Sequence, residues 1–219
     1  MKNKRRNILI SIILILIAIL FTILVKVIDV KQVGINQTAI GFATINQLIF
    51  NYLGVNMIWY YITDYLGLIP ILITIIYFII GIIQLIKRKS IFKVDKEIII
   101  LGIFYIVVIL IYILFEKVII NYRPILINNS PEASYPSSHT LMTICICGSS
   151  IIINKILFNN KITKYINLLS MIIILITVIG RLISGVHWFT DIIGGILISI
   201  SLLITFHTII DIIKNNWRI

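Results

Sequence analysis

Long apolar runs separated by short polar stretches make up most of this chain. A helix that crosses a bilayer needs about 20 mostly apolar residues, and six segments come close to that length. They are Ile8–Val25, Leu66–Ile86, Ile98–Phe115, Thr140–Ile153, Tyr165–Ile179 and Phe189–Ile210. The fourth and fifth are short, so we expect their helices to extend into the flanking polar residues. The pattern predicts an all-α fold: a polytopic membrane helix bundle with about six transmembrane helices, forming one domain over residues 1–219.

The composition agrees with a membrane protein and excludes an ordinary soluble domain. Hydrophobic residues make up 60% of the chain and the mean hydropathy is +1.11, whereas soluble domains are roughly 45–50% apolar. The basic start Met1–Arg6, followed by an apolar run, is also compatible with a cleavable signal peptide. That run is longer than a usual signal core, and residues 26–29 offer no small-residue cleavage site. We therefore expect an uncleaved first helix.

The net charge of +11 comes from 19 basic and 8 acidic residues. The basic residues lie between the hydrophobic segments and do not form one face, so they indicate membrane orientation and no nucleic-acid partner. Fourteen fall in the N-terminus, the 87–96 and 155–164 loops and the C-terminal tail. The other five, on the opposite side, are Lys26, Lys31, Lys117, Arg123 and Arg181. Because cytoplasmic loops are rich in Lys and Arg, this count predicts a multi-pass cell-membrane protein with both termini in the cytoplasm.

Residues 27–65 form the one long connection between predicted spans. The segment ends in an aromatic cluster, Trp59, Tyr60, Tyr61 and Tyr65. Such clusters are typical of the head-group layer of a membrane. We expect an interfacial helix or a flap that faces the substrate.

Three polar clusters remain once the spans are set aside, and all three lie on the predicted outer side. They are Lys117–Pro124, Tyr135–His139 and Arg181–Asp191. In the first, Lys117 and Arg123 offer two cations near a helix end, and an arginine binds phosphate oxygens bidentately. The alternative is that both side chains only extend to lipid head groups.

The second cluster leads directly into an apolar run. It reads Ser-Tyr-Pro-Ser-Ser-His-Thr over residues 134–140. Proline followed by serine is typical of a helix start, where free backbone N–H groups and the positive end of the helix dipole bind anions. A phosphate held there would have His139 beside it. A plain serine N-cap with an interfacial histidine is the alternative.

The third cluster holds His187 and Asp191, four residues apart. On a helix they share a face and can hydrogen-bond. A carboxylate on one imidazole nitrogen fixes the tautomer and leaves the other nitrogen as a nucleophile. Arg181 is placed to neutralise the group under attack, although a helix-capping His–Asp pair is the alternative. His207, deep in the last span, is interpreted as a packed or interface histidine without an acidic partner, outside the site.

Together the three clusters resemble the signature of the type 2 phosphatidic acid phosphatase family, whose soluble relatives include the vanadium haloperoxidases. That signature is a Lys, six residues and Arg-Pro; then Pro-Ser-Gly-His; then Ser-Arg, five residues, His, three residues and Asp. Here the second element is Pro-Ser-Ser-His (136–139), and the third is Arg181, five residues, His187, three residues and Asp191. The resemblance covers most of the chain beyond the first helix. It implies a phosphatase/haloperoxidase-like core to which the first helix, 8–25, is peripheral.

The sequence departs from this signature at three places. Ser138 replaces the glycine, and Gly180 replaces the serine before Arg181, so both changes exchange one small residue for another. Lys117 and Arg123 are separated by five residues instead of six. On a continuous helix this would rotate Lys117 by about 100° relative to Arg123. We therefore expect the helix to end between them, or Lys117 to contribute less than in relatives.

The resemblance also implies a role for each residue. His187 attacks phosphorus and forms a phosphohistidine, Asp191 stabilises the imidazolium, and His139 protonates the leaving oxygen and later activates water. The phosphate-binding residues are Lys117, Arg123, Ser137, Ser138 and Arg181, together with the backbone N–H groups of Ser138 and His139. The sequence has no acidic cluster suited to Mg²⁺ or Zn²⁺, so we expect no metal and no other cofactor.

We therefore predict a lipid phosphatase, a phosphoric monoester or diphosphate hydrolase that acts at the outer membrane face. A site at the mouth of an apolar bundle favours a lipid-tailed substrate, and the resemblance implies undecaprenyl diphosphate, phosphatidylglycerophosphate or phosphatidate. A lipid or sugar phosphotransferase would use the same residues with another acceptor. An anion transporter is less favoured, because transporters place ionisable residues near mid-membrane and these spans are nearly free of charge.

Overall fold

The structure, a computed structural model, describes residues 2–127, 129–158 and 160–215. Its α-helices are α1 (Lys2–Val27), α2 (Ala43–Leu53), α3 (Met57–Leu66), α4 (Leu68–Arg88), α5 (Lys96–Lys117), α6 (Ser138–Leu157), α7 (Lys161–Ile183) and α8 (Phe189–Asn215). Two 3₁₀ turns, η1 (Ile35–Gln37) and η2 (Ile91–Lys93), and an antiparallel pair of strands, β1 (Lys31–Gln32) and β2 (Ala39–Ile40), complete it. Met1 and Arg218, which entered the signal-peptide and charge arguments, lie outside the described residues.

Six helical segments are long and apolar enough to cross a membrane. They are Arg5–Val27, Met57–Arg88, Lys96–Lys117, Ser138–Leu157, Lys161–Ile183 and Phe189–Lys214. Each contains one of the predicted spans, and the fourth and fifth extend into the flanking polar residues as expected. The predicted all-α, polytopic membrane bundle is confirmed.

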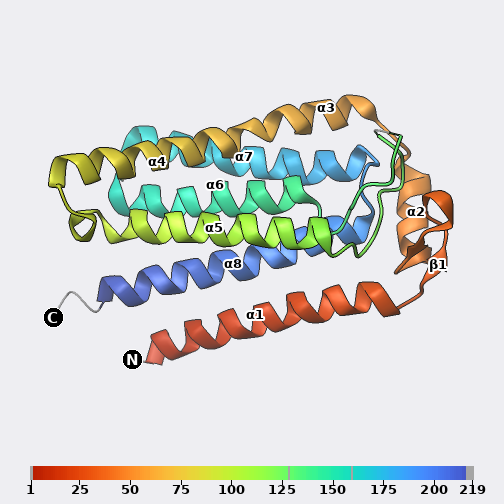
Figure 1. The fold of residues 1–219 in the computed structure, drawn as a ribbon, viewed down its shortest axis with the longest axis horizontal. Helices are drawn as coiled ribbons and strands as arrows, with labels where there is room; N and C mark the ends of the chain where they lie inside the picture. The colour runs from red at the N-terminus through yellow and green to blue at the C-terminus, as the bar shows by residue number, and fades with distance from the viewer. Residues whose placement is uncertain (1, 128, 159, 216–219) are drawn as a thin grey trace.

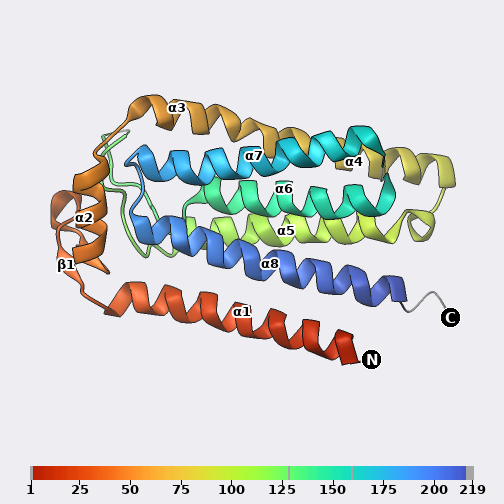
Figure 2. The same cartoon turned by 180° about the vertical axis from the view of Figure 1, so that it is seen from behind.

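The long helices run along one common axis, with α6 in the middle of the bundle (Figures 1 and 2). Helices α4, α5, α7 and α8 contact α6, and α1 packs along α8 at the edge. Leu141, Cys145 and Ile153 of α6 are fully buried. The outer helices expose large apolar side chains such as Phe78 and Leu175. Because exposure of so many apolar side chains to water is unfavourable, this surface is suited to contact with lipid.

A buried chain of hydrogen bonds joins three of the spans. The Tyr77 hydroxyl donates to Asn154 Oδ1 (2.9 Å), and Asn154 Nδ2 donates to Asn167 Oδ1 (2.9 Å). These residues lie on α4, α6 and α7. Polar side chains that pair between membrane helices typically contribute about 0.6 kcal/mol each. The network fixes the position of α6, whose first turn carries His139.

The three polar clusters lie at the same end of the bundle. There α5 and α7 end, α6 and α8 begin, and α2 with the β1–β2 hairpin covers the connecting segments (Figure 1). The α4–α5 and α6–α7 turns lie at the opposite end, as do the first and last helical residues. The chain therefore alternates between two ends, as a six-span topology requires.

The long 27–65 connection forms two helices at the end that carries the polar clusters. α2 follows the hairpin, and α3 carries the four aromatic residues and continues through Gly67 into α4. Asn56 caps α3 by accepting from the N–H groups of Ile58 and Trp59, and its own N–H donates to the Ser184 carbonyl oxygen at the end of α7. α3 is therefore attached to the end of α7. It is not an independent helix lying in the head-group layer.

Candidate active site

His187 lies between α7 and α8 with its imidazole buried. Its Nδ1 is 3.1 Å from the carbonyl oxygen of Ser134 and 3.2 Å from the Ser134 hydroxyl oxygen. A carbonyl oxygen only accepts hydrogen bonds, so Nδ1 carries the proton of the neutral ring. Nε2 then has the free lone pair, and it has no hydrogen-bond partner among the described residues. This is the tautomer that a nucleophilic histidine requires.

Asp191 supports His187 indirectly. Its Oδ2 is 3.9 Å from His187 Nδ1, too far for a hydrogen bond, so the predicted direct bond is wrong. The reason is local, because α8 begins two residues after His187 and helical i, i+4 geometry does not apply. Asp191 accepts instead from the Ser134 hydroxyl, from Asn121 Nδ2 (3.2 Å) and from the Trp188 N–H (2.9 Å). It thereby fixes the Ser134 loop that holds the imidazole.

The surroundings keep His187 uncharged. Burial lowers its pKa well below the ordinary value, and the positive charges of Arg123 and Arg181 lower it further. The hydrogen bond with the Ser134 carbonyl acts in the opposite direction but is a smaller contribution. An ordinary histidine has a pKa of about 6.5. Because the pKa of His187 is lower, its imidazole is neutral, and therefore nucleophilic, at pH 6.5 and above.

The start of α6 lies beside this histidine loop. Ser137 is the N-cap residue, and its N–H donates to the Asp191 carbonyl oxygen (3.0 Å), which joins α6 to α8. The Ser137 hydroxyl is buried and unpartnered among the described residues, as is Nδ1 of His139. Ser138 opens the helix, so its N–H and that of His139 have no partner within α6. The N-terminus of α6 therefore lies at the candidate site, as the sequence predicted.

Arg181 reaches the same region from the last turn of α7. Its side chain is fully buried, and its guanidinium lies 5.2 Å from the centre of the Tyr60 ring. Nη2 is 3.4 Å from Asp64 Oδ1, whereas Nε and Nη1 have no partner in the part of the chain that the structure describes. A buried cation is costly unless it is paired. Arg181 is therefore arranged to receive a further anion.

The connection after α5 brings Arg123 into the candidate site, whereas Lys117 remains on the surface. The Arg123 N–H donates to the Glu132 carbonyl oxygen (3.1 Å), Nε is 3.2 Å from Glu132 Oε2, and Nη1 is buried without a partner in the described chain. α5 ends at Lys117, so the helix does end between the two cations, as one alternative expected. The Lys117 side chain is exposed, and no hydrogen bond or ion pair joins it to another described residue.

Five of the eight predicted residues share one property. Buried polar atoms without a hydrogen-bond partner in the described chain occur on Arg123, Ser137, His139, Arg181 and His187. An unsatisfied buried polar group costs roughly 1–3 kcal/mol, so a ligand that pairs with these atoms would gain free energy from doing so. Arginine N–H groups and a serine hydroxyl donate hydrogen bonds. A ligand rich in acceptor oxygens, such as phosphate, fits this set.

Three residues near the site were missed by sequence reasoning. Ser134 and Asn121 hold His187 and Asp191. Asn121 lies inside the first cluster, and Ser134 immediately precedes the second. Asp64 comes from α3, and its Oδ1 is 3.2 Å from His139 Nε2. Only its position before a span, within the aromatic segment, could have drawn attention to it.

His207 lies outside the site, as predicted, but it does have an acidic partner. Its Nδ1 is 3.4 Å from Asp211 Oδ2, four residues later on the same helix. Both side chains are about half exposed. The pair belongs to the C-terminal part of α8, at the opposite end of the bundle from His187 (Figure 1).

The packing of α3 explains why Gly180 stands where the family signature has serine. A Cβ on Gly180 would lie 2.5 Å from Thr63 Cγ2 and 2.9 Å from the Trp59 ring. α3 therefore approaches α7 too closely for a larger residue at this position.

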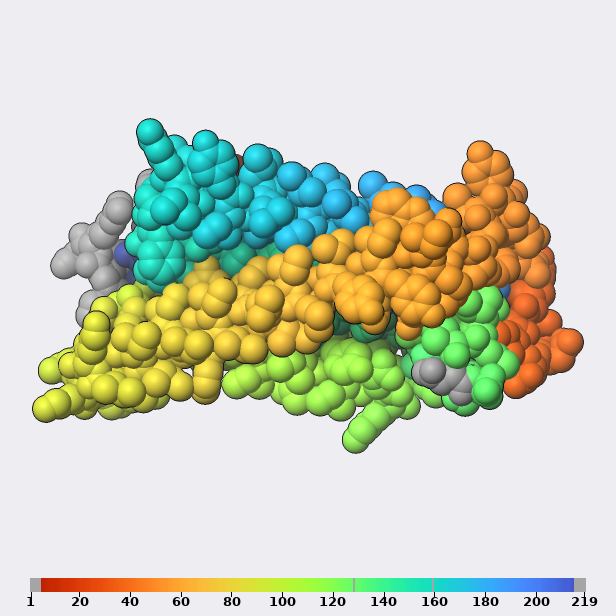
Figure 3. Space-filling model, turned by 90° about the horizontal axis from the view of Figure 1, so that it is seen from above, coloured from red at the N-terminus to blue at the C-terminus, as the bar shows by residue number. Residues whose placement is uncertain are grey.

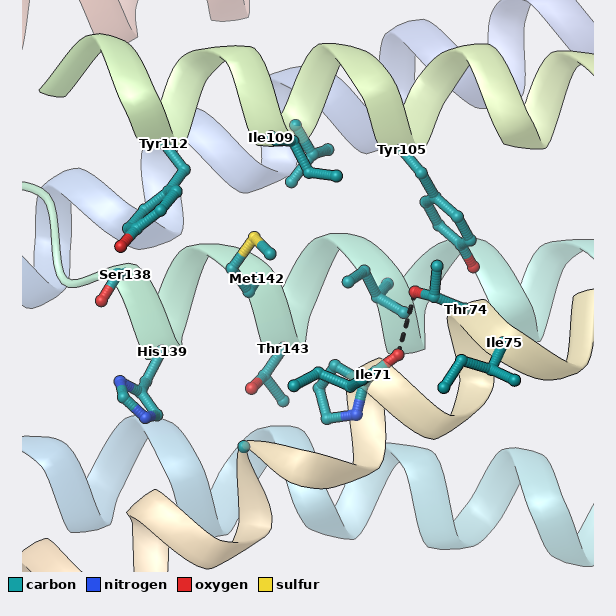
Figure 4. Close-up of a pocket in the computed structure, with 14 residues that line it drawn as sticks. Ile71, Thr74, Ile75, Tyr105, Ile109, Tyr112, Ser138, His139, Met142 and Thr143 are labelled. Carbon is teal, nitrogen blue, oxygen red and sulfur yellow. Dashed lines mark hydrogen bonds between the residues drawn. The ribbon is translucent and has the colours of Figure 1, made fainter. Parts of the chain in front are cut away.

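An apolar groove of about 440 Å³ leads away from His139. Figure 4 shows Ser138 and His139 at one end of it and Tyr105 and Ile75 toward the other, with the walls formed by α4, α5 and α6. In the space-filling view the surface is hollowed along the seam between α4 and α5 (Figure 3). The groove gives a hydrocarbon chain a path from the candidate site to the outer surface of the bundle.

Comparison with known proteins places the chain in a family. The family model described as the PAP2 superfamily matches residues 39–214. The chain belongs to the PAP2 superfamily. The match excludes α1 and includes every residue of the candidate site. It confirms the family inferred from the three clusters.

A solved structure has a fold similar to that of this PAP2 protein. The crystal structure of the first transmembrane PAP2 type phosphatidylglycerolphosphate phosphatase from Bacillus subtilis matches with a TM-score of 0.63 and 17% sequence identity. The match covers 92% of this chain and 96% of that one. No match was found among curated proteins. The protein thus shares the fold of that membrane protein.

Proposed function

We propose that this PAP2 protein hydrolyses the phosphomonoester or diphosphate of a membrane lipid through a phosphohistidine on His187. The observation that carries the proposal is the convergence of unpartnered buried donors from Arg123, Ser137 and Arg181 around two histidines. One of these, His187, is neutral with a free Nε2 lone pair. Phosphoryl transfer needs mainly positioning and neutralisation of charge, and these groups supply both.

The reaction has two steps. In the first, the Nε2 lone pair of His187 forms an N–P bond while the P–O bond to the lipid breaks, and His139 gives a proton to the leaving oxygen. Arg123, Arg181 and the α6 N-terminus stabilise the charge on the remaining phosphate oxygens. In the second, water attacks phosphorus and gives its proton to His139. The N–P electrons return to Nε2 and inorganic phosphate leaves.

The groove between α4 and α5 supports a lipid-tailed substrate. His139 lies at its polar end, and its walls are otherwise mainly apolar, with residues such as Ile71, Ile109 and Ile146. Burial of one CH₂ group contributes about 0.8 kcal/mol, so a tail of several carbons adds substantial affinity. A soluble phosphate ester would gain nothing from this groove.

The charge distribution supports a site on the outer face of the cell membrane. The end opposite the site carries the 87–96 and 155–164 loops, which are rich in Lys and Arg. By the positive-inside rule this end, with both termini, lies in the cytoplasm. Undecaprenyl diphosphate, phosphatidylglycerophosphate and phosphatidate are the substrates to compare.

The proposal predicts metal-independent release of phosphate. Among the described residues no group of three or more His, Cys, Asp or Glu side chains lies close enough to hold a metal ion. Purified protein in detergent or liposomes, with EDTA present, is expected to release inorganic phosphate from at least one of the three lipids. Analysis of the lipid products, with candidate acceptors present, separates hydrolysis from phosphotransfer. Failure to cleave any lipid phosphate, while phosphate crosses the liposome membrane, would favour an anion transporter instead.

A further inference from the structure

Asp64 is the one acidic side chain from outside the three clusters that pairs with His139 in the described structure. Its Oδ1 lies 3.2 Å from His139 Nε2 and 3.4 Å from Arg181 Nη2. The residue is 117 positions from Arg181 in sequence and comes from α3, which the family signature does not include. We propose that Asp64 is a positioning residue that holds His139 in the orientation and protonation state of a general acid. The inference rests on the proposed function.

Close packing places Asp64 over the site. A Cβ on Gly67, just after α3, would lie 2.9 Å from the His139 ring. On the other side, Thr63 and Trp59 press against Gly180, one residue before Arg181. The Asp64 carboxylate therefore projects from a helix that is held on both sides of it. This precision is what a group needs if it is to orient another side chain.

The contacts of Asp64 leave the substrate-facing atoms free. Arg181 uses only Nη2 for Asp64, so Nε and Nη1 remain unpartnered for a phosphate. His139 uses only Nε2, so its buried Nδ1 remains unpartnered. With Nε2–H donating to Asp64, Nδ1 is the atom that gives the proton to the leaving oxygen. Substrate binding thus does not require displacement of Asp64.

The charges around His139 make a carboxylate partner necessary. Arg181 on α7 and Arg123 in the connection after α5 place positive charge near its ring, and Tyr112 of α5 lines the same groove. The Asp64 carboxylate, 3.2 Å from His139 Nε2, is the negative group that stabilises an imidazolium there.

The test uses Asp64→Asn, which keeps the shape and removes the charge. We expect kcat for a lipid alkyl phosphate to fall about tenfold to a hundredfold, a part of the 10²–10⁴ that a general acid supplies, with KM changed much less. The basic limb of the kcat–pH profile moves to lower pH. Asp64→Glu restores part of the rate. Asp211→Asn is the matched control, because it removes the carboxylate of the other paired histidine, His207, at the far end.

A double variant shows whether Asp64 acts through His139. Since the proposed effect passes through that ring, Asp64→Asn should lower kcat no further in the His139→Ala background. Equal additional loss there, or an unchanged kcat with a lower KM in Asp64→Asn alone, would overturn the inference, since the carboxylate would then only hold the fold or compete with phosphate. Wild-type protein without phosphatase activity would instead overturn the proposed function itself.

Discussion

Replacement of His187 by alanine is expected to lower phosphate release from lipid substrates by about 10⁴-fold or more. Loss of the nucleophile from a catalytic group of residues costs up to about 10⁶ in kcat in other hydrolases. His187 Nε2 is the unpartnered nitrogen of a ring whose other nitrogen is held by Ser134. Steady-state phosphate release from the purified variant measures the effect.

The matched control for this variant is His207→Ala. His207 also has an aspartate four residues later, but the pair is about half exposed and lies at the other end of α8. This variant is expected to keep wild-type activity. Because His187 is buried, removal of its side chain could disturb the fold. His187→Gln, which keeps more of the side-chain volume, and a lipid-phosphate binding assay therefore test whether the variants still fold and bind substrate. Retention of more than about a tenth of the wild-type rate in a folded His187 variant contradicts the nucleophile assignment.

Replacement of His139 by alanine is expected to have the second largest effect, and its size should depend on the leaving group. For a lipid alkyl phosphate we expect kcat to fall by about 10²–10⁴-fold, the usual contribution of general acid–base catalysis. An aryl phosphate with an acidic leaving group needs no proton in the first step. For that substrate the first step should stay fast, and the second, in which His139 activates water, should become rate-limiting.

Rapid-quench kinetics separate the two steps. The His139→Ala variant should show a burst of aryl alcohol followed by slow turnover, whereas His207→Ala should behave as the wild type. Equal loss of the first step for alkyl and aryl phosphates would mean that His139 binds phosphate and does not act as the acid.

The transmembrane architecture was predictable because hydropathy is a local property. Each span is specified by its own residues, and polar neighbours such as Ser138 and Lys161 only extend the helix ends. The family signature likewise indicated the residues of the candidate site. The segment over residues 27–65 was less predictable, since its helices are held by contacts such as that of Asn56 with Ser184.

The details of the site depend on tertiary contacts that no local pattern contains. His187 is held by a backbone carbonyl, at Ser134, which any amino acid would supply, so the sequence could not reveal it. The four-residue spacing of His187 and Asp191 indicated a direct hydrogen bond only because a helix was assumed to begin earlier than it does. Asp64 reaches His139 because α3 packs over α7, a relationship between distant segments.

The most direct measurement is identification of the phosphorylated residue during turnover. The His139→Ala variant, with slow breakdown of the intermediate, is mixed with a lipid-tailed aryl phosphate, quenched in base and digested for mass spectrometry. The account predicts one phosphoryl group on the His187 imidazole, and none in the His187→Ala/His139→Ala double variant. Turnover with no phosphorylated His187, or with the phosphoryl group on another residue, would contradict it.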